Sequence, residues 1–191
     1  MARTAESDRI CQECWDRATY AHGTGEIFHA RTRRFRGNLR ALAFVGIAVP
    51  LAVGGVVLTF GTDSLDWKVL SFAGSLGLAQ LILSAWSIVY GWADSLEYSL
   101  ESASDNFALA ASLQELGRTA PDPPLDIEQR FAVLKTRDDL RRNGDARVGV
   151  SAKELRFGHR AGLRQFRRPC DGCKEVPRSM EPTNCNICGR F

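Results

Sequence analysis

Two apolar runs decide the fold: ALAFVGIAVPLAVGGVVLTF at residues 41–60 and VLSFAGSLGLAQLILSAWSIVYGWA at residues 69–93. Neither run contains a charged side chain. At a rise of ~1.5 Å per residue, each forms a helix of roughly 30 Å or more, enough to cross the hydrocarbon core of a bilayer. Buried helices of soluble proteins seldom stay uncharged over this length, and a secretory signal peptide would begin earlier and stand alone. The sequence therefore predicts a transmembrane hairpin with a short connector at Gly61–Lys68.

The charges beside the two runs predict the orientation of the hairpin. Residues 31–40, directly before the first run, contain no acid and five arginines: Arg31, Arg33, Arg34, Arg36 and Arg40. The connector holds Lys68 against Asp63 and Asp66. An excess of Lys and Arg marks the cytoplasmic side of a membrane protein. We therefore expect a multi-pass inner-membrane protein with both termini in the cytoplasm and its arginines at the lipid headgroups.

The rest of the 191 residues predicts a mainly α membrane protein with cytoplasmic helical extensions. We expect a helical segment at 1–40, interrupted at His22–Gly25, and a helical region at 94–150 that continues the second span without a break. Within that region, Pro121–Pro124 should end one helix, and Asn143-Gly144 should end the next. The last segment, 151–191, should hold a basic helix, which starts at a capping box of Ser151 and Glu154, and a small zinc ribbon.

One face of the second apolar run is small and weakly polar. Its residues recur at spacings of three and four: Ala73, Gly77, Gln80, Ser84, Ser87 and Gly91. Such a stripe is typical of a helix–helix interface, and it would also suit the wall of a pore in an oligomer. The same spacing continues through four further residues, Asp94, Tyr98, Glu101 and Asp105. This acidic extension is either a collar that attracts cations or a solvated helix face.

Six cysteines form three CxxC pairs. Eleven residues separate the pair Cys170 and Cys173 from the pair Cys185 and Cys188, a spacing typical of two knuckles that close on one metal ion. Cytoplasmic thiols stay reduced, which favours metal binding over disulfides. We expect structural Zn²⁺; an iron–sulfur cluster and redox sensing are the alternatives. The third pair, Cys11 and Cys14, would join a metal site, exchange disulfides or pack as buried thiols.

The last helix carries a basic stripe, and the chain carries no catalytic pattern. The stripe comprises Lys153, Arg156, Arg160, Arg164 and Arg167. It suits anionic lipid or nucleic acid, and nucleic acid is the less favoured of the two because no aromatic pattern is interleaved with the charges. The net charge of +3 indicates no partner, since basic and acidic segments are separate. We find no nucleophile–base pair, phosphate loop or catalytic zinc arrangement, so we expect no enzyme.

The arginine-flanked hairpin, the helical continuation and the final CxxC-x11-CxxC motif together resemble a known family. The chain resembles the SLATT superfamily of bacterial two-transmembrane effectors, in particular the mobile-element branch named for that motif. The gap Lys174–Asn184 matches the pattern. The resemblance implies that Cys170, Cys173, Cys185 and Cys188 are metal ligands. It also implies that the two spans form pores in antiviral (antiphage) conflict systems, under a sensor protein from a neighbouring gene. It implies no catalytic residue.

These observations lead to one expected function and one alternative. The expected protein is a non-enzymatic effector that forms a homo-oligomer and permeabilises the inner membrane, with a zinc ribbon that regulates it or binds a partner. In the alternative, the hairpin is only an anchor, and the zinc ribbon with its basic helix binds nucleic acid or a partner protein.

Overall fold

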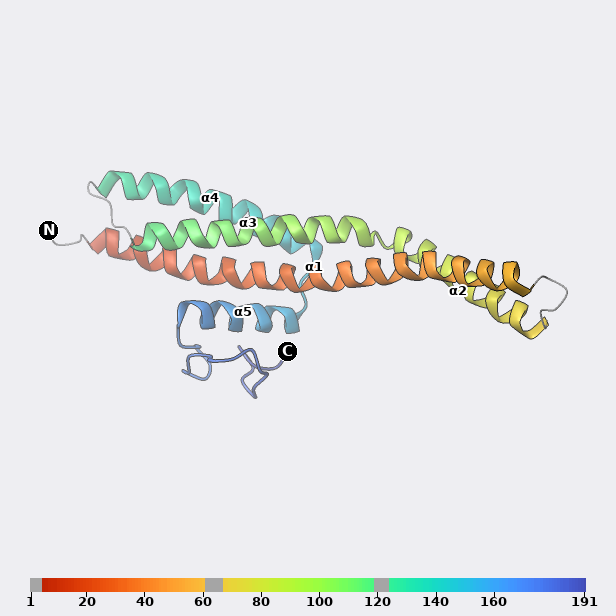
Figure 1. Cartoon of the computed structure of the whole chain (residues 1–191). Coiled ribbons are helices and arrows are strands. Elements are labelled where there is room, and N and C mark those ends of the chain that lie inside the picture. The colour runs from red at the N-terminus through yellow and green to blue at the C-terminus, as the bar shows by residue number, and fades with distance from the viewer. Residues whose placement is uncertain (1–4, 61–66, 119–123) are drawn as a thin grey trace. The chain divides into compact units, whose positions relative to one another are not determined.

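The computed structural model describes residues 5–60, 67–118 and 124–191, and these residues form five helices (Figure 1). The helices are α1 (Ala5–Phe60), α2 (Trp67–Val89), α3 (Trp92–Arg118), α4 (Pro124–Val148) and α5 (Ala152–Phe166). The chain then follows turns and loops to Phe191. The mainly helical class predicted from the sequence is confirmed. The predicted connector at residues 61–66 and the proline stop at residues 121–123 lie outside the described residues.

The chain divides into two compact units. The helical unit comprises Met1–Ala30 and Ser99–Phe191, and the hairpin unit comprises Arg31–Tyr98. The first therefore draws on the start of α1, most of α3, and all of α4 and α5, whereas the second contains the end of α1 and all of α2.

Both helices of the hairpin unit are long and apolar enough to span a membrane. In the most apolar stretches of α1 and α2, 0% and 6% of the residues are buried. A core helix of a soluble protein would bury most of its apolar side chains. Here large apolar side chains are exposed on both helices: Phe44, Ile47, Leu51, Leu58, Phe72, Leu81, Ile82 and Ile88. A core helix of a soluble protein can equal these helices in length and composition, but their apolar stretches differ from such a helix in being exposed.

The helical unit has its core where α1, α3 and α4 meet. The buried cluster consists of Ile10, Cys11, Cys14, Ala18, Leu113, Leu116, Ile127 and Phe131. Its α1 members recur every three or four residues, so one face of that helix turns inward. Phe166 at the end of α5 packs against the same cluster. Apolar burial therefore joins all four helical segments of this unit.

Helix α5 lies on α1 with the two backbones in close contact. A Cβ atom added at Gly162 would lie 2.2 Å from the carbonyl oxygen of Thr19, and one at Gly158 would lie 2.6 Å from that of Gly23. A Cβ atom at Gly23 would in turn lie 2.4 Å from the carbonyl oxygen of Gly158. Gly158 and Gly162 have the spacing that lets two helices approach closely. Gly23 therefore packs against α5 and does not break α1. The predicted interruption at His22–Gly25 was wrong.

Buried polar contacts fasten α4 to its neighbours. Asp145 of α4 accepts hydrogen bonds from Ser102 Oγ at 2.7 Å and from Asn106 Nδ2 at 2.8 Å, and all three residues are buried. Arg17 of α1 pairs with Asp138 of α4 at 2.6 Å. Asp145 lies directly after Asn143-Gly144, and its buried contacts hold this part of the chain against α3. Helix α4 therefore continues to Val148. The predicted stop at Asn143-Gly144 was therefore wrong.

The acidic extension of the second span is partly neutralised by α4. Arg141 pairs with Asp105 at 3.0 Å and with Glu101 at 3.3 Å. The continuation from α2 to α3 is also broken, because α2 ends at Val89 and Gly91 adopts a φ of +57°. Glycine reaches this left-handed conformation without the steric cost that other residues meet. The predicted unbroken rod was wrong at this position.

The predicted capping box at the start of α5 is confirmed. The backbone N–H of Glu154 donates to Ser151 Oγ at 3.3 Å, and the backbone N–H of Ser151 donates to Glu154 Oε2 at 2.9 Å. These contacts satisfy two donors that would otherwise lack partners at a helix start. They fix the start of the helix that carries the cysteine loops.

Replacing Gly162 by alanine tests the contact between α1 and α5. We expect Gly162→Ala to lower the free energy of unfolding by about 1–3 kcal/mol, because its methyl group would collide with rigid backbone. The matched control is Gly37→Ala in α1, where an added Cβ atom meets nothing within 4 Å. Chemical unfolding of both variants in detergent, followed by far-UV circular dichroism, measures the difference. Equal stability of the two variants would contradict the close contact.

Candidate metal centre

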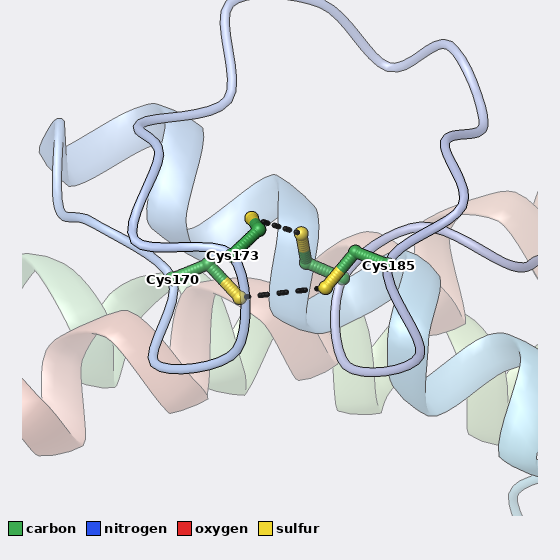
Figure 2. A group of neighbouring side chains, drawn as sticks. Cys170, Cys173 and Cys185 are labelled. Carbon is green, nitrogen blue, oxygen red and sulfur yellow. Dashed lines mark hydrogen bonds between the residues drawn. The ribbon is translucent and has the colours of Figure 1, made fainter.

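The four C-terminal cysteines converge on one point (Figure 2). The sulfur atoms of Cys170, Cys173, Cys185 and Cys188 all lie within 4.8 Å of one another. The distance is 4.0 Å from Cys170 to Cys185 and 3.8 Å from Cys173 to Cys188. Four sulfurs at ~2.3 Å from a tetrahedral metal ion would stand about 3.8 Å apart, whereas a disulfide would need about 2.05 Å. The four cysteines can therefore bind a metal ion.

Each CxxC pair lies in a tight turn closed by the same backbone contact. The N–H of Lys174 donates to the carbonyl of Cys170 at 2.7 Å, and the N–H of Gly189 donates to that of Cys185 at 2.9 Å. Lys174 has a φ of +60°. At Gly189, an added Cβ atom would lie 2.4 Å from the carbonyl oxygen of Thr183, so only glycine fits there. The two turns present paired sulfurs on facing loops.

Backbone N–H groups also act on the sulfur of Cys185. Hydrogen bonds from the N–H groups of Cys188 and Ile187 lower the pKa of the Cys185 thiol to about 6. The contact from Ile187 measures 3.4 Å. A metal ion binds the thiolate form of cysteine. At Cys185 the turn therefore favours the thiolate that metal binding requires, whereas burial raises the pKa of the Cys188 thiol.

Helix α5 serves as the platform for the cysteine loops. Leu163 of α5 packs with Cys170 and Cys188, which are 0% and 1% exposed. Phe157 of α5 meets the ring of Phe191 at a centroid distance of 5.5 Å. Cys173, by contrast, is exposed. One side of the cluster is thus buried on the helix and the other side is open.

Two arginines of the predicted basic stripe hold the loops instead of forming a free basic surface. Arg156 donates to the carbonyl of Arg190. Arg160 is buried and donates to the carbonyls of Ser179 at 2.8 Å and Cys188 at 3.3 Å. Arg160 was predicted to belong to a basic stripe that binds lipid or nucleic acid, and its contact with the loops was not predicted. One feature of the sequence could have indicated this contact. Arg160 lies three residues before the apolar Leu163, so both share one face of α5.

Cys11 and Cys14 lie elsewhere, in the apolar core of the helical unit. Among the described residues, the group that could hold a metal ion consists of the four C-terminal cysteines. Burial raises the pKa of Cys14 to about 12, with a smaller contribution from Cys11. At neutral pH its thiol stays protonated and poorly reactive. Of the three readings that the sequence left open for this pair, packed buried thiols fit these surroundings best.

The small-residue stripe of α2 faces inward within the hairpin unit. Its members are buried or half-buried: Ala73, Gly77, Gln80, Ser84, Ser87 and Gly91. Every other α2 side chain that the structure describes is exposed. A Cβ atom added at Gly46 of α1 would lie 3.2 Å from Gln80 Nε2. In the single chain, the stripe therefore packs against the first apolar run.

The flanking arginines lie along α1 at the start of the hairpin unit. Arg31 is half-buried, and the other four are exposed: Arg33, Arg34, Arg36 and Arg40. An exposed guanidinium on a long side chain can extend toward an aqueous or headgroup layer. The contact with lipid predicted for these arginines remains a prediction.

Metal content of cysteine variants tests the assignment. We expect one metal ion per wild-type chain and loss of that ion in Cys170→Ser or Cys185→Ser, because each substitution removes a thiolate ligand. Cys11→Ala and Cys14→Ala serve as controls and should keep the ion. Elemental analysis of purified protein gives the stoichiometry. Loss of the ion in the two alanine variants, with the serine variants unaffected, would contradict the assignment. The ion would then be bound at Cys11 and Cys14.

Comparisons with known proteins agree with this cysteine pattern. A family model described as "Mobilome CxxCx(11)CxxC protein" matches residues 11–191. This match includes all three CxxC pairs. No curated protein and no solved structure matches the chain. Because the match covers nearly the whole sequence, the chain belongs to the Mobilome CxxCx(11)CxxC protein family.

Proposed function

We propose that this protein spans the bacterial inner membrane twice, with both termini and the helical unit in the cytoplasm. The carrying observation is the exposure of the hairpin: the large apolar side chains of α2 face outward, whereas one stripe of that helix, which includes Gln80, Ser84 and Ser87, faces inward. In water this arrangement would expose a large apolar surface, but in a bilayer it matches the surroundings. The exposed arginines before the first run support the cytoplasmic placement.

We propose further that the protein is a non-enzymatic effector of a bacterial conflict system. Clustering of its hairpins into a homo-oligomer would permeabilise the inner membrane. Two features support this proposal: the resemblance to the SLATT superfamily and the polar stripe of α2. Gln80 and Ser84 are among the residues that cover the inner face of the single hairpin. If clustered hairpins exchange partner helices, this face would line water. A sensor protein from a neighbouring gene would supply the trigger.

We propose Zn²⁺ as the metal of the cysteine cluster, with a structural role. Four thiolates complete a tetrahedral site and leave no open position for a substrate. The loop between the CxxC pairs has little apolar core, so a metal bond would supply the folding energy that it lacks. The resulting zinc ribbon would regulate the hairpins or bind a partner.

The alternative is a tethered binding module with an inert anchor, and the contacts of α5 favour it less. Arg156 and Arg160 are bonded to the cysteine loops, and Arg168 pairs with Asp16 of α1. These hydrogen bonds and this ion pair reduce the basic surface that would bind the phosphates of a nucleic acid. A partner protein could still bind the open side of the cluster, near the exposed Cys173.

Dye leakage from liposomes tests the effector proposal. The full chain would be reconstituted with and without a cross-linker that forces clustering, and we expect leakage on clustering. Gly77→Leu should abolish it while insertion persists. In the single chain, a Cβ atom at Gly77 meets nothing within 4 Å, so the first atom of the new side chain fits there. The control, Ala79→Leu, changes an exposed position of the same helix and should leak like wild type.

Three results would argue against the proposal. Tight liposomes under both conditions would favour the tethered binding module. Unchanged leakage in Gly77→Leu would exclude this face as the contact or the pore wall. Equal loss in Ala79→Leu would indicate a general effect of added bulk.

A further inference from the structure

A buried positive charge lies directly beside the cysteine cluster. Arg160 of α5 is 5% exposed. Its Nε donates to the carbonyl of Ser179 at 2.8 Å, and its Nη1 donates to the carbonyl of Cys188 at 3.3 Å. The same Nη1 lies 3.9 Å from Cys188 Sγ, within hydrogen-bonding reach of sulfur. One guanidinium therefore contacts both the loop between the CxxC pairs and a sulfur of the cluster.

The surroundings of Arg160 do not supply an ordinary counter-charge. No carboxylate of the described residues forms an ion pair with it, although Arg17, Arg141, Arg142 and Arg168 all have such partners. A buried cation without a compensating anion is strongly unfavourable. Four thiolates around one divalent ion carry a net formal charge of −2. The metal–thiolate centre is therefore the anion that fits this guanidinium.

We propose that Arg160 is part of the metal centre: its guanidinium balances the thiolate charge, holds Cys188 Sγ and ties the intervening loop to α5. This inference rests on metal binding by the four cysteines, and it does not depend on membrane permeabilisation. Arg160 acts as a positioning residue, since it contacts a ligand and not the metal. Groups that hydrogen-bond to metal ligands commonly set their orientation and the affinity of the site.

The chemistry of the contact calls for arginine and not merely for a positive charge. A guanidinium presents several N–H donors in a fixed plane, so it can contact Ser179 and Cys188 together. The ammonium group of lysine is a compact point charge on a flexible stem, and it would keep only part of this pattern. Metal affinity should therefore differ between arginine, lysine and an uncharged side chain of similar size at position 160.

Cobalt(II) titration of the full chain in detergent tests the inference. Wild-type protein should bind one Co²⁺ with the intense near-ultraviolet absorption of thiolate-to-cobalt charge transfer. Arg160→Met should weaken the affinity by about 10- to 100-fold, the usual effect of removing a group that supports a metal ligand. Arg160→Lys should fall between the two. The control is Arg156→Met, which removes a bond from α5 to a loop carbonyl without touching a sulfur, and it should bind nearly as wild type does.

Alkylation supplies a second readout, which is independent of metal affinity. In metal-loaded protein treated with N-ethylmaleimide, Arg160→Met should expose Cys188 to faster labelling, as mapped by mass spectrometry. Cys14, buried in the separate apolar cluster, should stay protected and thereby report an intact helical unit. If Arg160→Met fails to fold by this criterion, Arg160→Lys, which keeps the charge, decides the test.

The outcomes separate this inference from the metal assignment. Cobalt affinity and Cys188 labelling that match wild type in Arg160→Met would overturn it. Equal weakening in Arg156→Met would also overturn it, because any bond between α5 and the loop would then suffice. A wild-type chain that binds no Co²⁺ would refute the metal centre together with the role of Arg160. That last result would not decide the permeabilisation proposal, which dye leakage tests separately.

Discussion

The backbone contact between α1 and α5 determines where the cysteine loops lie. At Gly23, Gly158 and Gly162 the two helices approach so closely that no side chain fits between them. This contact turns one face of α5 toward α1 and leaves Arg160 and Leu163 to support the cysteines. Helix α1 is itself unbroken from Ala5 to Phe60. Helix α1, against which α5 packs, therefore also contains the first apolar run.

Polar burial has a different role in each unit. In the helical unit, carboxylates such as Asp138 and Asp145 are buried with arginine or hydroxyl and amide partners from neighbouring helices. Removing one partner of such a group leaves an unpaired buried charge, so these contacts specify which helices pack together. In the hairpin unit, the inward face of α2 uses small residues and uncharged polar groups. This composition is suited to close helix packing where apolar burial gives little driving force.

Sequence periodicity predicted most of the helices, because each carries apolar residues at helical spacing or a recognisable cap. The cysteine site was also predictable, since four ligands at a fixed spacing converge without knowledge of the remaining fold. Three of the errors came from residues whose role depends on a distant partner, whereas the break at Gly91 is local. The residues His22–Gly25 resemble a helix interruption until α1 and α5 are placed together. Asn143-Gly144 resembles a stop until Asp145 meets Ser102, and Arg160 resembles a surface charge until the loop folds over it.

The central claim is that the two apolar runs lie in a bilayer, and membrane flotation after alkaline carbonate extraction tests it most directly. Carbonate removes peripheral proteins, and flotation in a density gradient separates membrane vesicles from aggregates. The account predicts that the full chain, expressed in bacteria, floats with the inner-membrane fraction after extraction. Recovery in the carbonate supernatant would contradict the account, as would sedimentation away from lipid.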